Sequence, residues 1–149
     1  MRIEEEIKSH FDDEWQKAVV NILFTSHWIR DLHVTILKEH DLQPQHYNVL
    51  RIVKGSHPKP VAPGYIRDVM LDKGADVTRL LNKLEEKKYI HREICQSNRR
   101  MIDVHLTPLG VNFLEIINPQ IQQMAKNMHK CLKRKDAELL SNLLDKLRG

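Results

Sequence analysis

The chain has 149 residues and a formal net charge of +4, and this length is enough for one domain with a sizeable core. Hydrophobic residues make up 41% of it and charged residues 30%, and five glycines with six prolines argue against an all-β architecture. No apolar run is long enough to cross a bilayer, and residues 1–6 lack the features of a signal peptide. Two cysteines, Cys95 and Cys131, have no metal-type spacing and suggest a reducing compartment, so we expect a cytoplasmic protein with no membrane partner.

The N-terminal part of the chain predicts one long helix. After an amphipathic lead-in over residues 2–10, helical spacing of apolar residues continues from Asp12 or Asp13 to His40. The apolar positions cover more than one side of this helix, so it should contact both its own domain and a second copy of the chain. Four residues that mix aromatic and ionisable groups either line a pocket for a small-molecule effector or pack at an interface: His27, Trp28, Asp31 and His33.

The segment from residue 41 to residue 71 predicts two shorter helices. Pro44 can occupy the first position of a helix whose buried face should consist of Tyr47, Leu50, Ile52 and Val53. Residues 55–64 contain three prolines and are expected to form a loop, with a short strand near Val61. A short helix over residues 65–71 should then pack through Ile66, Val69 and Met70.

Residues 75–88, which follow a turn at residues 72–74, predict a third, strongly amphipathic helix. Its apolar residues recur at intervals of three and four and form one face, made of Val77, Leu80, Leu81 and Leu84. The opposite face begins with short side chains and continues with hydrogen-bonding and cationic ones: Ala75, Asp76, Arg79, Asn82 and Lys83. Periodicity alone would also fit an ordinary solvent-exposed helix.

After Lys88 the apolar period changes from 3.6 to 2, which indicates two strands over residues 89–95 and 101–106. One face should hold the apolar residues Ile90, Ile94, Ile102, Val104 and Leu106. The polar connector is short, so the strands should form an antiparallel hairpin with Arg99 and Arg100 at its tip. Between Lys73 and Met101 there are eight cations and four anions, so this segment carries a net charge equal to that of the whole chain. Such local positive charge suits a phosphate backbone or a narrow minor groove.

The C-terminal part predicts two more helices. Thr107 and Pro108 form an N-cap followed by proline at the first helical position. The helix that follows should bury Phe113, Ile116, Ile117, Ile121, Met124 and Met128, with a kink or break near Asn118 caused by Pro119. Beyond a junction at residues 133–136, the last helix carries a seam of Leu140, Leu143, Leu144 and Leu147. This seam packs either between subunits or within one chain.

Three motifs in order carry a family resemblance: DKGADVTRLLNKLEEK at residues 72–87, NRR at 98–100 and VHLTPLG at 104–110. Together they resemble the MarR family of dimeric winged-helix transcription regulators, and the resemblance extends over nearly the whole chain. Two positions depart from the family pattern. Asn98 replaces an acidic residue, so a charge pairing there must become a neutral hydrogen bond. Lys88 replaces a glycine, at a cost of about 1 kcal/mol if the backbone there is left-handed.

The resemblance implies a mainly α fold with a small β-hairpin wing in a single MarR-like domain over residues 1–149. Residues 41–107 would form a winged helix-turn-helix lobe that binds DNA, and residues 1–40 and 108–149 would supply dimerisation helices. The implied function is a homodimeric transcription regulator of pseudo-palindromic operators in double-stranded DNA, usually a repressor relieved by a small-molecule effector.

The expected DNA contacts follow from the helix and the hairpin. Residues assigned to the major groove are Asp76, Thr78, Arg79, Asn82 and Lys83, with Arg79 the strongest candidate for a bidentate guanine contact. Asp76 alternatively caps the helix, and Thr78 alternatively covers the flank of the core. Arg99 and Arg100 are expected to enter the minor groove or to bind the phosphates beside it.

Other functional classes have less support. The sequence has no phosphate-binding glycine loop, nucleophile elbow or paired carboxylates, so we expect no enzyme and no cofactor. The nine histidines are scattered without a tight pair, so no metal site is predicted, and the long helix has no cysteine for oxidation sensing. The alternative is a winged-helix adaptor that binds proteins. Such an adaptor should lack exposed cations on the amphipathic helix that ends at residue 88 and at the tip of the hairpin.

Overall fold

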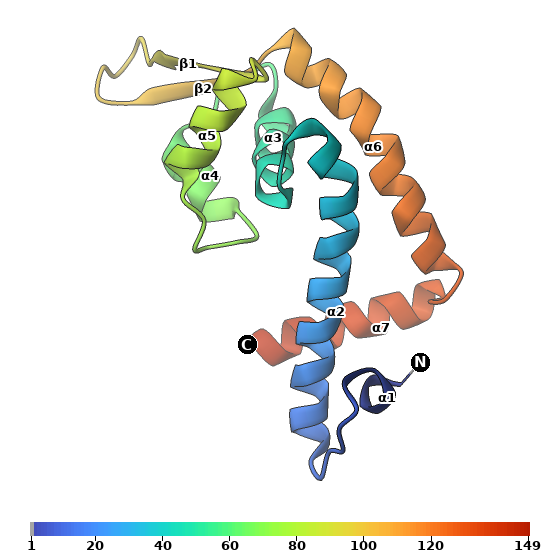
Figure 1. Ribbon diagram of the computed structural model, residues 1–149. Coiled ribbons are helices and arrows are strands. Elements are labelled where there is room, and N and C mark those ends of the chain that lie inside the picture. The colour runs from blue at the N-terminus through green and yellow to red at the C-terminus, as the bar shows by residue number, and fades with distance from the viewer. Residues whose placement is uncertain (1) are drawn as a thin grey trace. The chain divides into compact units, whose positions relative to one another are not determined.

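The computed structural model describes residues 2–149, which divide into two compact units, one ending at Pro44 and one running from Gln45 to Gly149 (Figure 1). The described chain contains seven α-helices, one 3-10 helix and one two-stranded hairpin. The mainly helical fold with a β-hairpin wing is therefore confirmed.

The first unit consists of α1 (Ile3–Ile7), α2 (Glu14–Leu37) and the 3-10 helix η1 (Lys38–His40). Asp13 caps α2, because its carboxylate accepts hydrogen bonds from the backbone N–H groups of Trp15 and Gln16, each at 3.1 Å. The start of the long helix agrees with the prediction within two residues, but the α-helix ends at Leu37, and the predicted stretch to His40 is the 3-10 helix η1. Much of its apolar surface is exposed in the single chain, including Trp15, Val19, Leu23 and Trp28.

The second unit begins with α3 (Pro44–Ser56) and α4 (Pro63–Val69), followed by α5 (Val77–Glu86). Pro44 opens α3 as predicted. The start of α4 was placed two residues too late, because Pro63 occupies its first turn, where a missing N–H costs nothing. Ile66 and Met70 are buried as expected, whereas Val69 is exposed and the prediction that it packs inward is wrong. It lies on the outer side of this short helix.

The hairpin pairs β1 (Ile90–Ile94) with β2 (Ile102–Leu106) in antiparallel register, from Ile90 opposite Leu106 to Ile94 opposite Ile102. Val61 adds a single bridge to Val104, through N–O distances of 3.1 and 2.9 Å, where a short strand was expected. Ile90, Val104 and Leu106 are buried, but Ile94 and Ile102 at the outer end are exposed. Only the inner half of the predicted apolar face therefore reaches the core.

The core of the second unit draws on α3, α4, α5, the hairpin and the first half of α6 (Pro108–His129). In α3 the buried residues include Val49, Leu50 and Val53, while Tyr47 and Ile52 are only half-buried. In α6 the buried residues are Phe113, Leu114 and Ile117. Ile116 is exposed, so its predicted burial is wrong: the buried face of α6 includes Leu114 instead. Further along, Ile121, Met124 and Met128 are half-buried.

Pro119 lies inside α6, and the helix continues through it to His129 without the predicted break. The carbonyl that loses its partner belongs to Glu115, which is exposed, so water can satisfy that carbonyl. Asn118 links α6 to α3: its side-chain oxygen accepts from the Tyr47 hydroxyl at 2.8 Å and from Arg51 Nη1 at 3.4 Å. These bonds fix the middle of α6 against the lobe that carries α5.

The last helix, α7 (Arg134–Arg148), buries no residue within the chain. Its leucines are exposed, with fractions of 47% for Leu140, 55% for Leu143 and 60% for Leu147. Leu144 is half-buried.

Over residues 2–149 we also find no helix with the length and apolar character needed to span a membrane.

Candidate nucleic-acid interface

The helix α5 starts at a side-chain cap. Asp76 lies at the N-cap position and its carboxylate accepts a hydrogen bond from the backbone N–H of Arg79 at 3.0 Å. Before it, Asp72 accepts from the N–H of Gly74 at 3.0 Å and shapes the turn that leads into α5. Of the two roles predicted for Asp76, the structure contains the cap, which orients the first turn of the helix.

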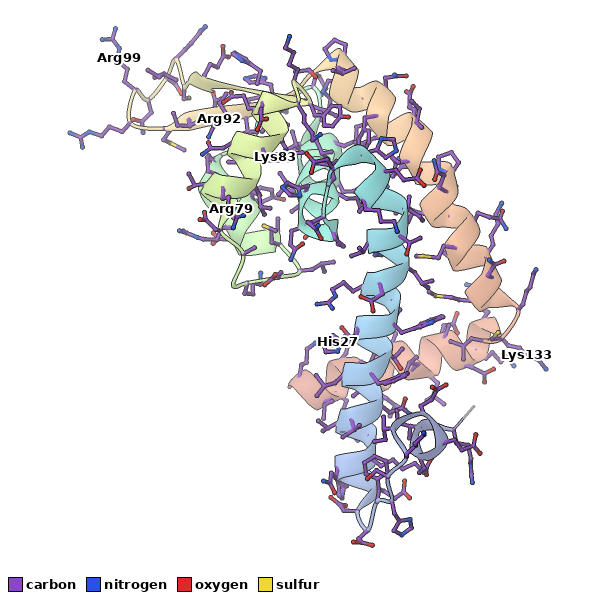
Figure 2. All side chains as sticks on the ribbon, in the orientation of Figure 1. His27, Arg79, Lys83, Arg92, Arg99 and Lys133 are labelled. Carbon is purple, nitrogen blue, oxygen red and sulfur yellow. The ribbon has the colours of Figure 1, made fainter. Side chains whose placement is uncertain are left out.

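The two faces of α5 differ in exposure. Val77, Leu81 and Leu84 are buried and Leu80 is half-buried, as the spacing predicts. The other side leaves Thr78, Arg79 and Asn82 exposed and Lys83 half-buried. Figure 2 shows Arg79 and Lys83 along this helix. The side chains assigned to the major groove thus come together on one helix, whose opposite face packs against the core.

The wing ends in a tight polar turn. The backbone N–H of Met101 donates to the Asn98 carbonyl at 2.9 Å, and the N–H of Asn98 donates to the Cys95 carbonyl at 3.2 Å. The Asn98 side chain accepts from the N–H of Arg100 at 3.1 Å, so this position makes a neutral hydrogen bond within the turn. Arg99 and Arg100 are both exposed, and Arg99 lies at the free end of the hairpin (Figure 2).

The junction between α5, the hairpin and α6 is closely packed. Lys88 has φ 59°, so the left-handed backbone considered from the sequence is present on a lysine. Thr107 caps α6 by accepting from the N–H of Gly110 at 3.0 Å, and its hydroxyl donates to the Lys88 carbonyl at 2.6 Å. A side chain at Gly110 would collide with the backbone oxygen of Tyr89. Only glycine permits this close approach.

One pair at this surface was not predicted from the sequence. Glu85 on α5 accepts from Arg92 on β1 three times: Oε1 from the backbone N–H at 3.0 Å, and Oε2 from Nε at 3.0 Å and Nη2 at 2.5 Å. The hydrogen bonds from the Arg92 side chain lower the pKa of the Glu85 carboxyl below its usual value. The available signal was the position of Arg92 among the apolar alternate residues of β1, where a charge requires a partner.

The four candidate effector residues lie on α2, and they do not share one face. His27 and Asp31 are one turn apart and exposed, and Trp28 is exposed beside them. His33 follows His27 by about 1.7 turns and therefore points to another side of the helix. His33 is half-buried, and burial lowers its pKa below the usual value.

Outside α2, a hollow of about 310 Å³ lies beside the wing, lined by Ala62, Pro63, Gly64, Arg100, Met101 and Ile102.

Comparison with known proteins bears on this arrangement of helices and hairpin. A family model described as the MarR family matches residues 40–101, which include α3, α4, α5 and β1. A MarR transcription factor from Planctomyces limnophilus is 26% identical, with a TM-score of 0.70 over 91% of this chain and 98% of that one. These matches support the MarR family for this chain.

Other relatives agree with this assignment. The chain is 23% identical over 111 residues to the HTH-type transcriptional regulator MhqR of Bacillus subtilis, covering 74% of this chain and 75% of MhqR. Two solved structures contain DNA. The S. aureus MepR–DNA complex has a TM-score of 0.78 at 20% identity over 93% of this chain and 97% of that one. A mutant MarR from E. coli complexed with operator DNA has 0.79 at 23% identity over 93% and 99%.

The likeness to these solved structures shows the winged-helix fold, and the relatives are named as transcription regulators.

Proposed function

We propose that this chain is a MarR-family transcription regulator, and that it acts as a homodimer that binds double-stranded DNA through α5 and the wing. One observation carries the proposal. The buried apolar face of α5 packs this helix firmly into the core of the second unit, while Thr78, Arg79 and Asn82 are exposed to solvent in the same unit as the arginine wing tip. The DNA in the MepR complex and in the mutant MarR complex supports the same partner for this chain.

In this proposal α5 lies in the major groove. Arg79 contacts a guanine with its two-pronged guanidinium, a contact that discriminates by about 1–3 kcal/mol. Thr78, Asn82 and Lys83 contact neighbouring base edges or phosphates, while Asp76 acts through the cap that orients Arg79. Arg99 and Arg100 bind the adjacent minor groove or its phosphates, and because the phosphate charge is independent of sequence, they add affinity on every duplex.

The homodimer is proposed from apolar surface that the single chain leaves exposed. In the first unit this surface lies on α2 and includes Trp15, Val19 and Leu23. In the second unit it lies on α7 and includes Leu140, Leu143 and Leu147. A monomeric soluble protein rarely leaves long apolar helix faces in water, and a second copy can cover them symmetrically. Two copies would present two α5 helices to a pseudo-palindromic operator.

We further propose repression that a small-molecule effector relieves, a role that the family resemblance supports. The candidate effector contacts on α2 are His27, Trp28 and Asp31, with His33 on another side of the helix.

The second candidate function, an adaptor that binds proteins, predicts a neutral α5 surface and wing tip. The exposed Arg79, Arg99 and Arg100 favour DNA over that alternative.

The test is selection of bound duplexes from a random pool, performed with the wild-type chain and with Arg79→Ala. The proposal predicts two inverted half-sites about one helical turn apart, and loss of preference at one guanine position of each half-site in the variant. Salt-dependent affinity for the selected duplex should accompany this result. Failure to enrich any duplex, with salt-independent capture of a protein partner, would support the adaptor instead.

A further inference from the structure

The contact between Glu85 and Arg92 joins the two elements proposed to touch DNA. We call these two residues the clasp. Glu85 belongs to the last turn of α5 and Arg92 to the middle of β1, seven residues further along the chain. Both are partly buried, with side-chain exposures of 36% for Glu85 and 25% for Arg92. The pair therefore lies between α5 and the hairpin and is only partly exposed to water.

The backbone arrangement explains why a carboxylate is needed at this place. Val104 directs its N–H and C=O to Val61, so the opposite pair of Arg92 and Val104 makes no hydrogen bonds across the hairpin. The N–H of Arg92 consequently points to the outer edge of β1. Glu85 Oε1 satisfies that N–H at 3.0 Å, while Oε2 holds the guanidinium. One side chain thus fixes both the strand backbone and its arginine.

The clasp also changes the role of Arg92. A guanidinium whose Nε and Nη2 both donate to Glu85 is neutralised and oriented toward α5. Arg92 is therefore a poor phosphate contact, although the sequence counts it among the cations of this segment. Its geometry instead restrains β1, and through β1 the position of Arg99 and Arg100 relative to Arg79.

We propose that Glu85 is a positioning residue for DNA binding, which sets the angle of the wing to α5 so that both reach one duplex. This inference rests on the proposed DNA-binding function. It makes a prediction of unusual sign, because Glu85 is an anion beside a polyanion. If only charge mattered, removing the Glu85 carboxylate would tighten DNA binding, because it would reduce repulsion from the phosphates. If Glu85 positions the wing, removing it should weaken DNA binding.

The chain offers a matched control in Glu86, the next residue on α5, which is exposed. Glu85→Ala and Glu86→Ala remove the same charge from neighbouring positions. We expect Glu85→Ala to weaken binding to the selected duplex roughly ten-fold, and Glu86→Ala to leave it unchanged or slightly tighter. Arg92→Ala should also weaken binding, and the double variant with Glu85→Ala should be no weaker than the worse single variant.

A second readout separates positioning from loss of stability. If the wing is displaced, Glu85→Ala should flatten the slope of log affinity against log salt toward that of Arg99→Ala/Arg100→Ala, although it removes no cation. A merely less stable protein would lose active fraction at an unchanged slope. Amide exchange without DNA adds a test of the clasp itself: the N–H of Arg92 should exchange faster in Glu85→Ala than in Glu86→Ala.

The outcomes separate this inference from the proposed function. If the wild-type chain binds the duplex and Glu85→Ala matches Glu86→Ala in affinity and slope, the positioning role is overturned and DNA binding stands. If the wild-type chain binds no duplex, the proposed function fails first. Should Glu85→Ala unfold, Glu85→Gln serves instead: it keeps an acceptor for the Arg92 N–H and should show a smaller loss in the same direction.

Discussion

Two helices of similar amphipathic pattern, α5 and α7, differ in what covers their apolar faces. In α5 the apolar residues are packed inside the same chain, with Leu81 and Leu84 fully buried. In α7 Leu144 is half-buried, the other leucines are exposed, and the helix buries no residue within the chain. Both helices have apolar residues at intervals of three and four, so periodicity alone does not distinguish them.

The difference indicates what each helix needs. The face of α5 is satisfied by its own unit, so its polar side is available for a partner of different chemistry. The apolar face of α7 is available for a partner that is also apolar, and the proposed second copy of the chain would supply one. Substitutions in these helices, in the wing and in the turn after α5 test this contrast, with effects of decreasing size.

The largest effect is expected from charge in the α7 seam. Leu143→Asp/Leu147→Asp places two carboxylates where each leucine would contribute about 1.5–3 kcal/mol of burial, twice in a two-fold dimer. We expect a monomer by sedimentation, with operator binding lost. Asn142→Asp on the opposite side of α7 is the control and should remain dimeric. A dimer that survives the double substitution would contradict the assignment of this seam to the interface.

The next effect compares one substitution in both helices. Leu84→Ala in α5 should lower the free energy of unfolding by about 2–5 kcal/mol, because it leaves a cavity in the core. That loss should be the same at every protein concentration. Leu143→Ala in α7 should instead lower stability in a concentration-dependent manner, since it weakens association. Chemical denaturation at several concentrations measures both, and identical behaviour of the two variants would remove the contrast.

The wing arginines should give a moderate effect of a different kind. Arg99→Ala/Arg100→Ala should weaken binding to every duplex, and the slope of log affinity against log salt should fall by roughly 1 for each phosphate that the wing no longer binds. Lys130→Ala/Lys133→Ala is the control, since it removes two exposed cations just beyond the C-terminal end of α6, and Figure 2 shows Lys133 far from the hairpin. An unchanged slope in the wing variant would show that the wing assignment is wrong.

The smallest effect concerns the backbone after α5. Lys88 has a left-handed φ of 59°, so Lys88→Gly should stabilise the fold by about 1 kcal/mol. Lys87 is the matched neighbour with φ −77°, and Lys87→Gly should destabilise by roughly 0.5–1 kcal/mol. Thermal or urea unfolding measures both. Equal effects of the two glycines would mean that the strain at Lys88 is relieved in another way.

The sequence predicted those elements whose signal is local. The spacing of Val77, Leu81 and Leu84 and the alternation around Ile90 and Val104 locate α5 and the hairpin within a residue or two. Thr107 and Pro108 mark the start of α6 because a cap and a proline act on their own neighbours.

Features that depend on distant parts of the chain were not predictable in this way. The exposure of Ile94, Ile102 and Ile116 depends on where the core ends, which their local pattern does not encode. The clasp joins Glu85 and Arg92 across the change from helical to strand periodicity, so no single period relates them. Pro119 resembles a helix breaker until the exposure of Glu115 shows that its carbonyl can reach water.

The main proposition is that two copies of the chain present α5 and the wing to one duplex. It is tested by the stoichiometry of the complex with the selected duplex, measured by analytical ultracentrifugation and compared with a duplex that holds one half-site. We predict two chains on the full site and much weaker binding to the single half-site. One chain bound per duplex, with equal affinity for full and half sites, would contradict this proposition.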